Sequence, residues 1–163
     1  MLVKNSPEYR LADNLWTKGK GHLFGVLAIE QVSRAYAVEH DIEDVERFIF
    51  SGRYSASLHL LLGFAAELLT KTAYILHGGE PALIRKPAIR HDLIALLDAA
   101  EERAFTAPDP HTRAILAYLR EPHRNHQFRY GEEDEVPMPD LVHTIPALQV
   151  MSNQLQDMLE AAV

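Results

Sequence analysis

The sequence of 163 residues contains no cysteine, and it has fewer cationic than anionic side chains. Without cysteine there is no disulfide framework, no thiolate metal site and no cysteine nucleophile, which excludes zinc ribbons, iron–sulfur proteins and cysteine hydrolases. Sixteen Lys and Arg against 23 Asp and Glu give a net charge of −7. This balance disfavours binding of nucleic acid or anionic membranes through bulk charge, although it leaves room for a local basic site.

Long hydrophobic runs are also lacking. The most apolar stretch, residues 58–69, is interrupted by His59, Gly63 and Glu67, and it is shorter than the roughly 20 apolar residues of a membrane span. The N-terminal residues 1–7 have no apolar run behind Lys4, so they do not resemble a signal peptide. We therefore expect a soluble, cytoplasmic protein that has no contact with a membrane.

Alternating β-branched residues are absent, and the spacing of apolar residues is helical nearly throughout. A chain of this length is expected to form one domain, here residues 1–163, with a core large enough to be stable alone. The predicted fold class is all-α, an antiparallel bundle of about five to six helices.

Two helices are expected before residue 40. Ser6, Pro7 and Glu8 predict a helix start, since they supply an N-cap oxygen, a proline at the first helical position and a carboxylate near the positive end of the dipole. The glycine-containing residues 17–21 predict an early end to that helix. A second helix is expected over residues 23–38. Its predicted apolar face comprises Ala28, Ile29, Val32, Ala35 and Tyr36.

The central helix is predicted over residues 54–77, with an alternative start near Asp44 and a bend at Gly52. Gly78 and Gly79 follow it, and glycine is the usual residue for a left-handed helix end. Because apolar residues surround most of this helix, we expect it in the middle of the bundle. A narrow polar strip is left: His59, Gly63, Glu67, Thr70, Tyr74 and His77.

Three further helices are expected after the central one. The first covers residues 91–107, and the second runs from Pro110 to Pro122, where proline ends or kinks the helix. The third covers residues 145–162, because Pro146 fits only a first turn. The inward stripe expected for the second of these helices comprises Ile115, Tyr118 and Leu119.

Glu67 and Lys71 lie four residues apart on the predicted central helix and have two interpretations. On an exposed strip they form a pair that stabilises the helix by a few tenths of a kcal/mol. Alternatively, Glu67 faces a polar seam and positions the cationic residues that follow later in the chain.

The densest polar cluster is residues 120–130, which contain three arginines and two histidines beside a helix end. Arginine binds phosphate oxygens through its guanidinium fork, and histidine exchanges protons near neutral pH. Such residues can cleave a phosphodiester without a metal. The alternative is a solvated helix end whose cations face the acidic residues 132–135.

A metal site is not expected. His123 and His126 have a spacing that can hold one metal ion on a helix face, but no third ligand is adjacent in sequence. Neither His-Glu-x-x-His nor Glu-x-x-His occurs, so the sequence supports neither a metalloprotease helix nor a di-iron bundle. No cofactor is predicted.

Residues 52–74 resemble the central helix of HEPN domains, which carries a Glu, two Leu and a Lys in this arrangement. His91-Asp92-Leu93 is similar to the start of that family's next helix, and the cluster at 120–130 follows where the family keeps its catalytic motif. The resemblance covers roughly residues 20–160. It implies a helical bundle, usually a homodimer. Active members are metal-independent endoribonucleases that often act as toxins or in phage defence, and others are nucleotide-binding or accessory modules.

The resemblance also implies roles for individual residues. Arg120 and His126 match the Arg-x4-6-His motif of the active members and become the expected catalytic pair, which would act on RNA. The other expected substrate-binding residues are Glu67, Arg124, Asn125, Arg129 and Tyr130.

A second alignment of the motif remains open. The family often has Asn directly after its Arg, as in Arg124-Asn125, and this alignment places Arg129 where the His belongs. Pro122 also lies inside the motif. On this alignment the protein is a catalytically inactive module that binds a nucleotide or a protein partner, such as an antitoxin. A homodimeric scaffold is the remaining alternative.

Overall fold

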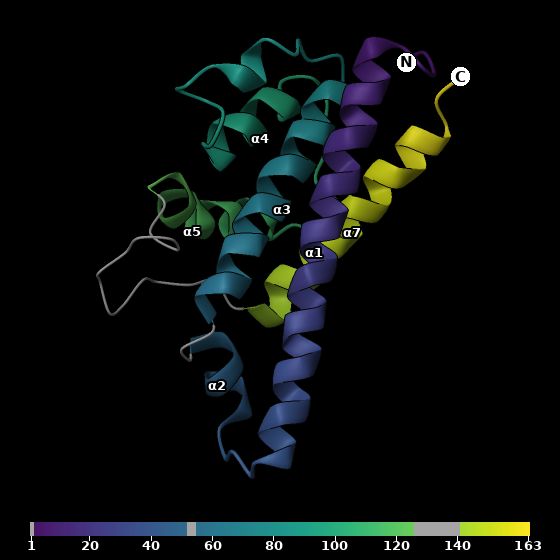
Figure 1. Ribbon diagram of the computed structural model, residues 1–163. Helices are drawn as coiled ribbons and strands as arrows, with labels where there is room; N and C mark the ends of the chain where they lie inside the picture. Colours follow the sequence, from purple (N-terminus) through teal and green to yellow (C-terminus); the bar gives the residue numbers. More distant parts are fainter. Residues whose placement is uncertain (1, 52–54, 126–140) are drawn as a thin grey trace.

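A computed structural model describes residues 2–51, 55–125 and 141–163, and these residues contain helices and no strand (Figure 1). The predicted all-α bundle is confirmed. The α-helices, together with one short 3₁₀ helix η1, are α1 (Pro7–Glu39), α2 (Val45–Ser51), α3 (Ser55–Leu76), η1 (Leu83–Arg85), α4 (Leu93–Glu101), α5 (Thr112–Arg124) and α7 (Leu141–Glu160).

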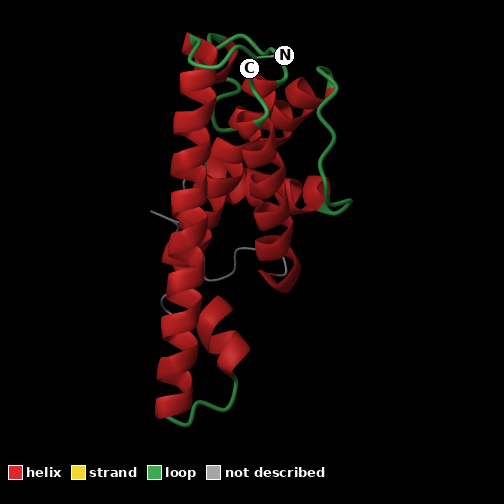
Figure 2. Ribbon diagram, turned by 90° about the vertical axis from the view of Figure 1, so that its right-hand side faces the viewer, coloured by secondary structure: helices red, strands yellow, loops and turns green. Residues whose placement is uncertain are grey.

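Helix α1 is continuous, and the predicted break at residues 17–21 is wrong. The helix begins as expected, because the Ser6 hydroxyl accepts a hydrogen bond from the Tyr9 amide at 3.1 Å. Gly19 is buried where α1 packs against α3, and a Cβ on it would lie 3.2 Å from Leu69. The glycine therefore allows close helix packing, and the packing outweighs its low helix propensity. Figure 2 shows α1 running the length of the molecule.

The second half of α1 leaves the bundle and is accompanied there by α2 (Figure 1). The apolar face predicted for this half is therefore only partly correct. Val32 and Tyr36 are exposed, at 69% and 48%, whereas Val26 and Ala37 are fully buried. Arg34 pairs with Glu30, four residues earlier on the same helix, at 3.0 Å.

Helix α3 packs against all the other α-helices of the described chain, which confirms its predicted central position. It ends before Gly78, whose φ of 79° is the left-handed conformation expected there. By length and apolarity α3 could cross a membrane, but 78% of its most apolar window is buried inside the molecule, as in the core helix of a soluble protein. The predicted polar strip is not on the surface, because His59, Glu67 and Thr70 are all buried.

The boundaries of the later helices differ from the predicted ones. Helix α4 ends at Glu101, before a turn in which Ala104 adopts a φ of 66°. Helix α5 begins at Thr112 and continues two residues past Pro122, and its Tyr118 is 60% exposed instead of facing inward. Helix α7 begins at Leu141, so Pro146 lies inside it rather than in the first turn. A proline removes one backbone hydrogen bond, and here the surrounding helix tolerates that loss.

Candidate functional site

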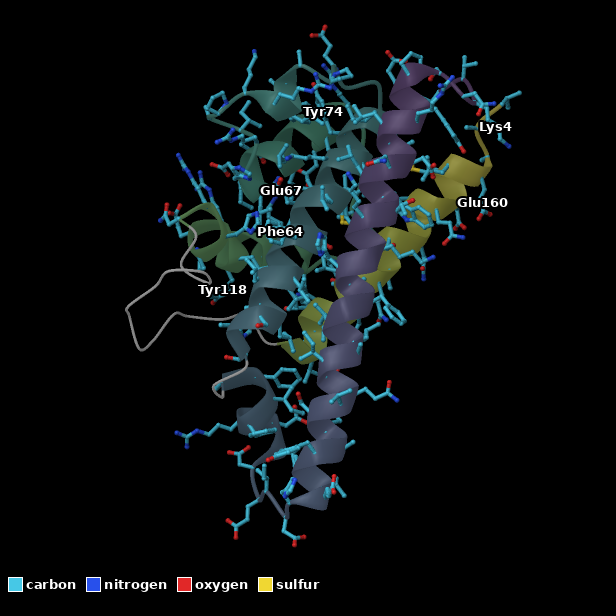
Figure 3. All side chains as sticks on the ribbon, in the orientation of Figure 1. Lys4, Phe64, Glu67, Tyr74, Tyr118 and Glu160 are labelled. Atoms are coloured by element: carbon cyan, nitrogen blue, oxygen red, sulfur yellow. The ribbon has the colours of Figure 1, made fainter. Side chains whose placement is uncertain are left out.

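The candidate site is built around Glu67, which lies midway along α3 on the side that faces α4 and α5 (Figure 3). The side chain is 7% exposed. A buried carboxylate needs partners, because its desolvation is costly without them. The exposed-strip interpretation of Glu67 and Lys71 is therefore wrong.

Three side chains donate hydrogen bonds to the Glu67 carboxylate. Lys71 Nζ contacts Oε1 at 2.5 Å, from the next turn of α3. His123 Nε2 from α5 lies 2.6 Å from Oε2, and His91 Nδ1, two residues before α4, lies 2.9 Å from the same oxygen. We call these four residues the Glu67 cluster. It joins three parts of the chain that are far apart in sequence.

The partners determine the ionisation of Glu67. Burial alone raises the pKa of this carboxyl, but the hydrogen bonds from His123, His91 and Lys71 outweigh burial and lower the pKa to about 2. The carboxylate is therefore ionised at neutral pH and can only accept hydrogen bonds. It follows that His91 Nδ1 and His123 Nε2 each carry the proton of their hydrogen bond to the carboxylate.

Gly63 makes room for His123. The His123 side chain is 4% exposed and packs against the backbone of Gly63. Gly63 lies one turn before Glu67 on α3. A Cβ on Gly63 would lie 2.5 Å from His123 Nδ1, closer than side chains pack. The ring also contacts Phe64 edge-on, with centroids 5.6 Å apart. A side chain at position 63 would displace the ring from Glu67.

Gly63→Ala is expected to lower the free energy of unfolding by about 1–3 kcal/mol, since the added methyl overpacks a buried site. Gly21→Ala is the matched control, because a Cβ there meets nothing within 4 Å on the same kind of helical backbone. It should instead stabilise the protein by about 0.5–1 kcal/mol. Urea unfolding of both variants measures these changes, and equal effects would contradict the described position of His123.

A second carboxylate, that of Asp92, directly follows His91 in the sequence and forms ion pairs with two arginines. Its Oδ1 caps α4 by accepting the Ala95 amide at 3.1 Å. Arg120 forms a bidentate pair with it, Nε to Oδ1 at 2.8 Å and an Nη to Oδ2 at 2.6 Å. Arg124 reaches Oδ2 at 3.4 Å. The hydrogen bonds from Arg120 keep the pKa of Asp92 below its usual value, against the opposing effect of burial.

The structure brings some of the predicted site residues together. Arg120 and Arg124 meet at Asp92, and Glu67 holds His123, which lies between them on α5. Asn125 lies at the C-terminal end of α5, where its amide donates to Glu121 at 3.2 Å. The remaining predicted residues lie outside the described part of the chain: His126, Arg129 and Tyr130.

Sequence reasoning missed three residues of this arrangement. His91 and Asp92 were expected only as part of a predicted helix start, and His123 only as one of the histidines in residues 120–130. The one available signal was the adjacent pair His91-Asp92. The His91 side chain contacts Glu67, and the Asp92 side chain contacts Arg120. Nothing in the sequence shows that residues 67, 91 and 123 converge.

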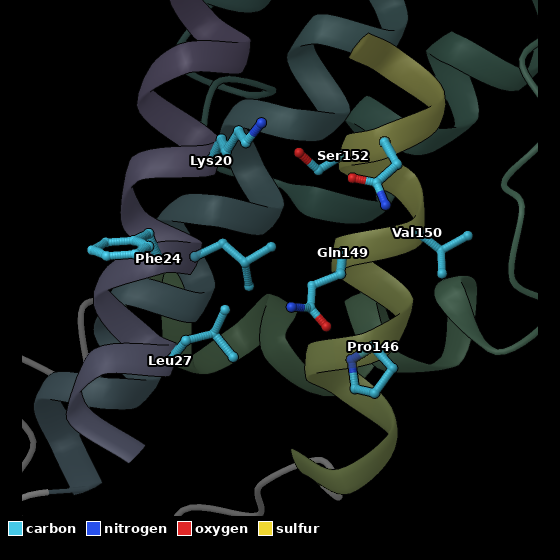
Figure 4. Close-up of a pocket in the computed structure, with 9 residues that line it drawn as sticks. Lys20, Phe24, Leu27, Pro146, Gln149, Val150 and Ser152 are labelled. Atoms are coloured by element: carbon cyan, nitrogen blue, oxygen red, sulfur yellow. The ribbon is translucent and has the colours of Figure 1, made fainter. Parts of the chain in front are cut away.

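A separate pocket lies between α1 and α7, with a volume of about 400 Å³ (Figure 4). Lys20, Phe24, Pro146 and Val150 are among its lining residues, and no member of the Glu67 cluster lines it. The nearby Trp16 indole donates to the Ser152 carbonyl at 3.0 Å and ties the two helices together. Of the predicted catalytic pair, Arg120 does not line this pocket, and His126 lies outside the described residues.

Comparison with known proteins adds no assignment: no family model, no curated protein and no solved structure matches this chain. The resemblance to HEPN domains consequently remains a prediction. What bears on function is the chemistry of the Glu67 and Asp92 carboxylates and their partners.

Proposed function

We propose that the protein is a HEPN-like, metal-independent endoribonuclease of the toxin or defence type. The observation that carries the proposal is the pair of arginines on Asp92. Arg120 and Arg124 come from adjacent turns of α5, and their side chains remain 38% and 47% exposed while one carboxylate orients both. Oriented, partly exposed guanidinium groups are suited to binding the phosphates of RNA.

Further cations precede Asp92 in the sequence. Arg90 is exposed two residues before Asp92, and Lys86 is exposed in the same segment. Local groups of cations can bind a polyanion despite the net charge of −7. The Glu67 cluster also helps to position the arginines. Its hydrogen bond to His123 holds the part of α5 that carries Arg120 and Arg124.

The proposed reaction needs a base and an electrostatic catalyst. His126 takes the proton from a ribose 2′-hydroxyl, and the resulting oxygen attacks the adjacent phosphorus. Arg120 stabilises the negative charge that develops on the phosphate, while Arg124, Asn125, Arg129 and Tyr130 bind the flanking nucleotides. As this bond forms, the bond between phosphorus and the 5′-oxygen breaks, and the leaving oxygen takes up a proton from water. The products are a 2′,3′-cyclic phosphate and a free 5′-hydroxyl. DNA is resistant because it lacks the 2′-hydroxyl.

The test is incubation of the purified protein with mixed cellular RNA in the presence of EDTA. We expect wild type to cleave and His126→Ala not to cleave. His111→Ala is the control, because this exposed histidine lies at the other end of α5, and it should cleave like wild type. Absence of cleavage by wild type at high protein concentration would contradict the catalytic proposal.

A second candidate function is favoured by the same pair. Arg120 already satisfies its guanidinium with Asp92 in a bidentate pair, so a phosphate has to compete with that carboxylate. A homodimeric scaffold fits this arrangement, and so does a non-catalytic module that binds a nucleotide through Arg124, whose contact with Asp92 is longer, at 3.4 Å. It predicts no turnover of RNA, together with a rise in melting temperature when a nucleotide is added.

Assembly and location complete the proposal. We propose a cytoplasmic homodimer that associates with a protein partner such as an antitoxin. The support for an interface is the set of exposed apolar side chains on α1, where Phe24 is 72% and Val38 is 74% exposed. Light scattering on the sample used for the RNA assay should give twice the mass of the chain.

A further inference from the structure

The Glu67 cluster contains a set of side-chain atoms that the proposed ribonuclease reaction leaves unused. One carboxylate oxygen of Glu67 and one ring nitrogen each of His91 and His123 lie within 4.8 Å of one another. They come from α3, from the segment before α4 and from α5. No metal was expected from the sequence, because no third ligand is adjacent to His123 and His126. The fold instead brings Glu67 and His91 to His123 from distant parts of the chain.

From this convergence we infer that Glu67, His91 and His123 bind one divalent transition-metal ion, for which Zn²⁺ is the probe. Two imidazoles and one carboxylate form a set that zinc prefers, with a fourth position left for water. The binding site goes beyond the proposed function, since that reaction requires no metal.

The three ligand atoms, which lie within 4.8 Å of one another, have to move into tetrahedral positions around the ion. Tetrahedral zinc with bonds of about 2.0–2.1 Å places its ligand atoms about 3.3 Å apart. Glu67 Oε2 lies 2.9 Å from His91 Nδ1 and 2.6 Å from His123 Nε2, so these atoms have to separate by a few tenths of an ångström. The proton on each of these nitrogens leaves it, either to the other ring nitrogen or to solvent.

The surroundings fit a bound ion. Lys71 contacts Oε1, not Oε2, so it can orient the carboxylate while Oε2 binds the metal. Gly63 and Phe64 hold the His123 ring in place. The His91 side chain is 34% exposed, whereas the exposed fractions of the Glu67 and His123 side chains are below 10%. The ion can therefore enter from solvent beside His91 and bind at a site that is otherwise buried.

Titration of the full, metal-free chain with Zn²⁺ by calorimetry tests the inference, and Co²⁺ absorption reports tetrahedral coordination. We expect one tight site per chain. His91→Ala should weaken it at least about 100-fold, because loss of a direct ligand exceeds the 10–100-fold effect of an outer partner. His91 is partly exposed, so this variant should fold; its circular dichroism spectrum checks that.

His111→Ala is the matched control, since His111 lies near His143 on another part of the surface, with ring centroids 6.5 Å apart. It should leave the tight site unchanged. Equal zinc affinity of wild type and His91→Ala, loss of the site in His111→Ala, or an octahedral cobalt spectrum would each overturn the inference. RNA cleavage in EDTA is measured without metal, so failure of the zinc site and failure of the ribonuclease proposal are distinguishable.

Discussion

Glu67→Gln is expected to lower the free energy of unfolding by about 3–5 kcal/mol, the usual effect of removing one member of a buried ion pair. Glutamine is similar in size, but it leaves the Lys71 ammonium, whose side chain is 10% exposed, without its anion. The amide also cannot accept from both histidines and the lysine as a carboxylate does. Urea unfolding at pH 7 in EDTA measures the change.

The control is Glu30→Gln, which removes a glutamate from another pair at the same helical spacing. Arg34 is 42% exposed and also contacts Glu46 at 2.7 Å, so it keeps an anionic partner in solvent. Exposed pairs contribute about 0–1 kcal/mol. Similar losses in the two variants would contradict the buried environment described for Glu67.

The pH dependence of stability follows from the same residue. The folded-state pKa of Glu67 is lowered from 4.5 to about 2, so its contribution is fully present above about pH 4.5 and is lost as pH falls towards 2. The shift corresponds to about 3 kcal/mol. Wild type should therefore lose about this much more stability than Glu67→Gln over that interval. Parallel acid curves for the two proteins would argue against the lowered pKa.

Arg120→Lys is expected to reduce the rate of RNA cleavage by about 100- to 1000-fold, the range seen when one preorganised donor to a developing negative charge is removed. Lysine keeps the charge but cannot form the bidentate pair with Asp92, whose two distances are 2.8 and 2.6 Å. The ammonium would therefore lose the fixed orientation of the guanidinium. Single-turnover cleavage in EDTA measures the effect.

Arg113→Lys is the control for this substitution. Arg113 also lies on α5 and contacts two carboxylates, those of Asp98 and Glu101, but near the start of the helix and away from Asp92. Its replacement should leave the cleavage rate unchanged. An equal reduction in both variants would show that general damage to α5, rather than loss of phosphate contacts, explains the effect at Arg120.

Several elements could be predicted from local sequence signals. Ser6 caps α1 as expected, and Asp92 caps α4 within the predicted helix start, because capping depends on a side chain and an amide a few residues away. Gly78 adopts the left-handed conformation just after the end of α3 for a similarly local reason. The continuity of α1 could not be predicted, because Gly19 is explained only by the neighbouring side chain of Leu69.

The candidate site, too, was only partly predictable from local sequence signals. The arginines at 120 and 124 were recognised from their residue types, and the polar-seam interpretation of Glu67 agrees with its contacts to two histidines. The partners of these residues could not be foreseen. Helix α4 and the residues after it separate His91 and Asp92 from α5 in the sequence. Only tertiary packing brings Asp92 to Arg120 and places His91 beside Glu67 and His123.

A buried, ionised Glu67 holds both His123 of α5 and His91 of the segment before α4. An NMR titration of the Glu67 side-chain carboxyl in metal-free protein tests this arrangement most directly. We expect a pKa of about 2, held there by His123, His91 and Lys71. A pKa at or above the ordinary value of 4.5 would show that burial is not offset by these partners and would contradict the arrangement described.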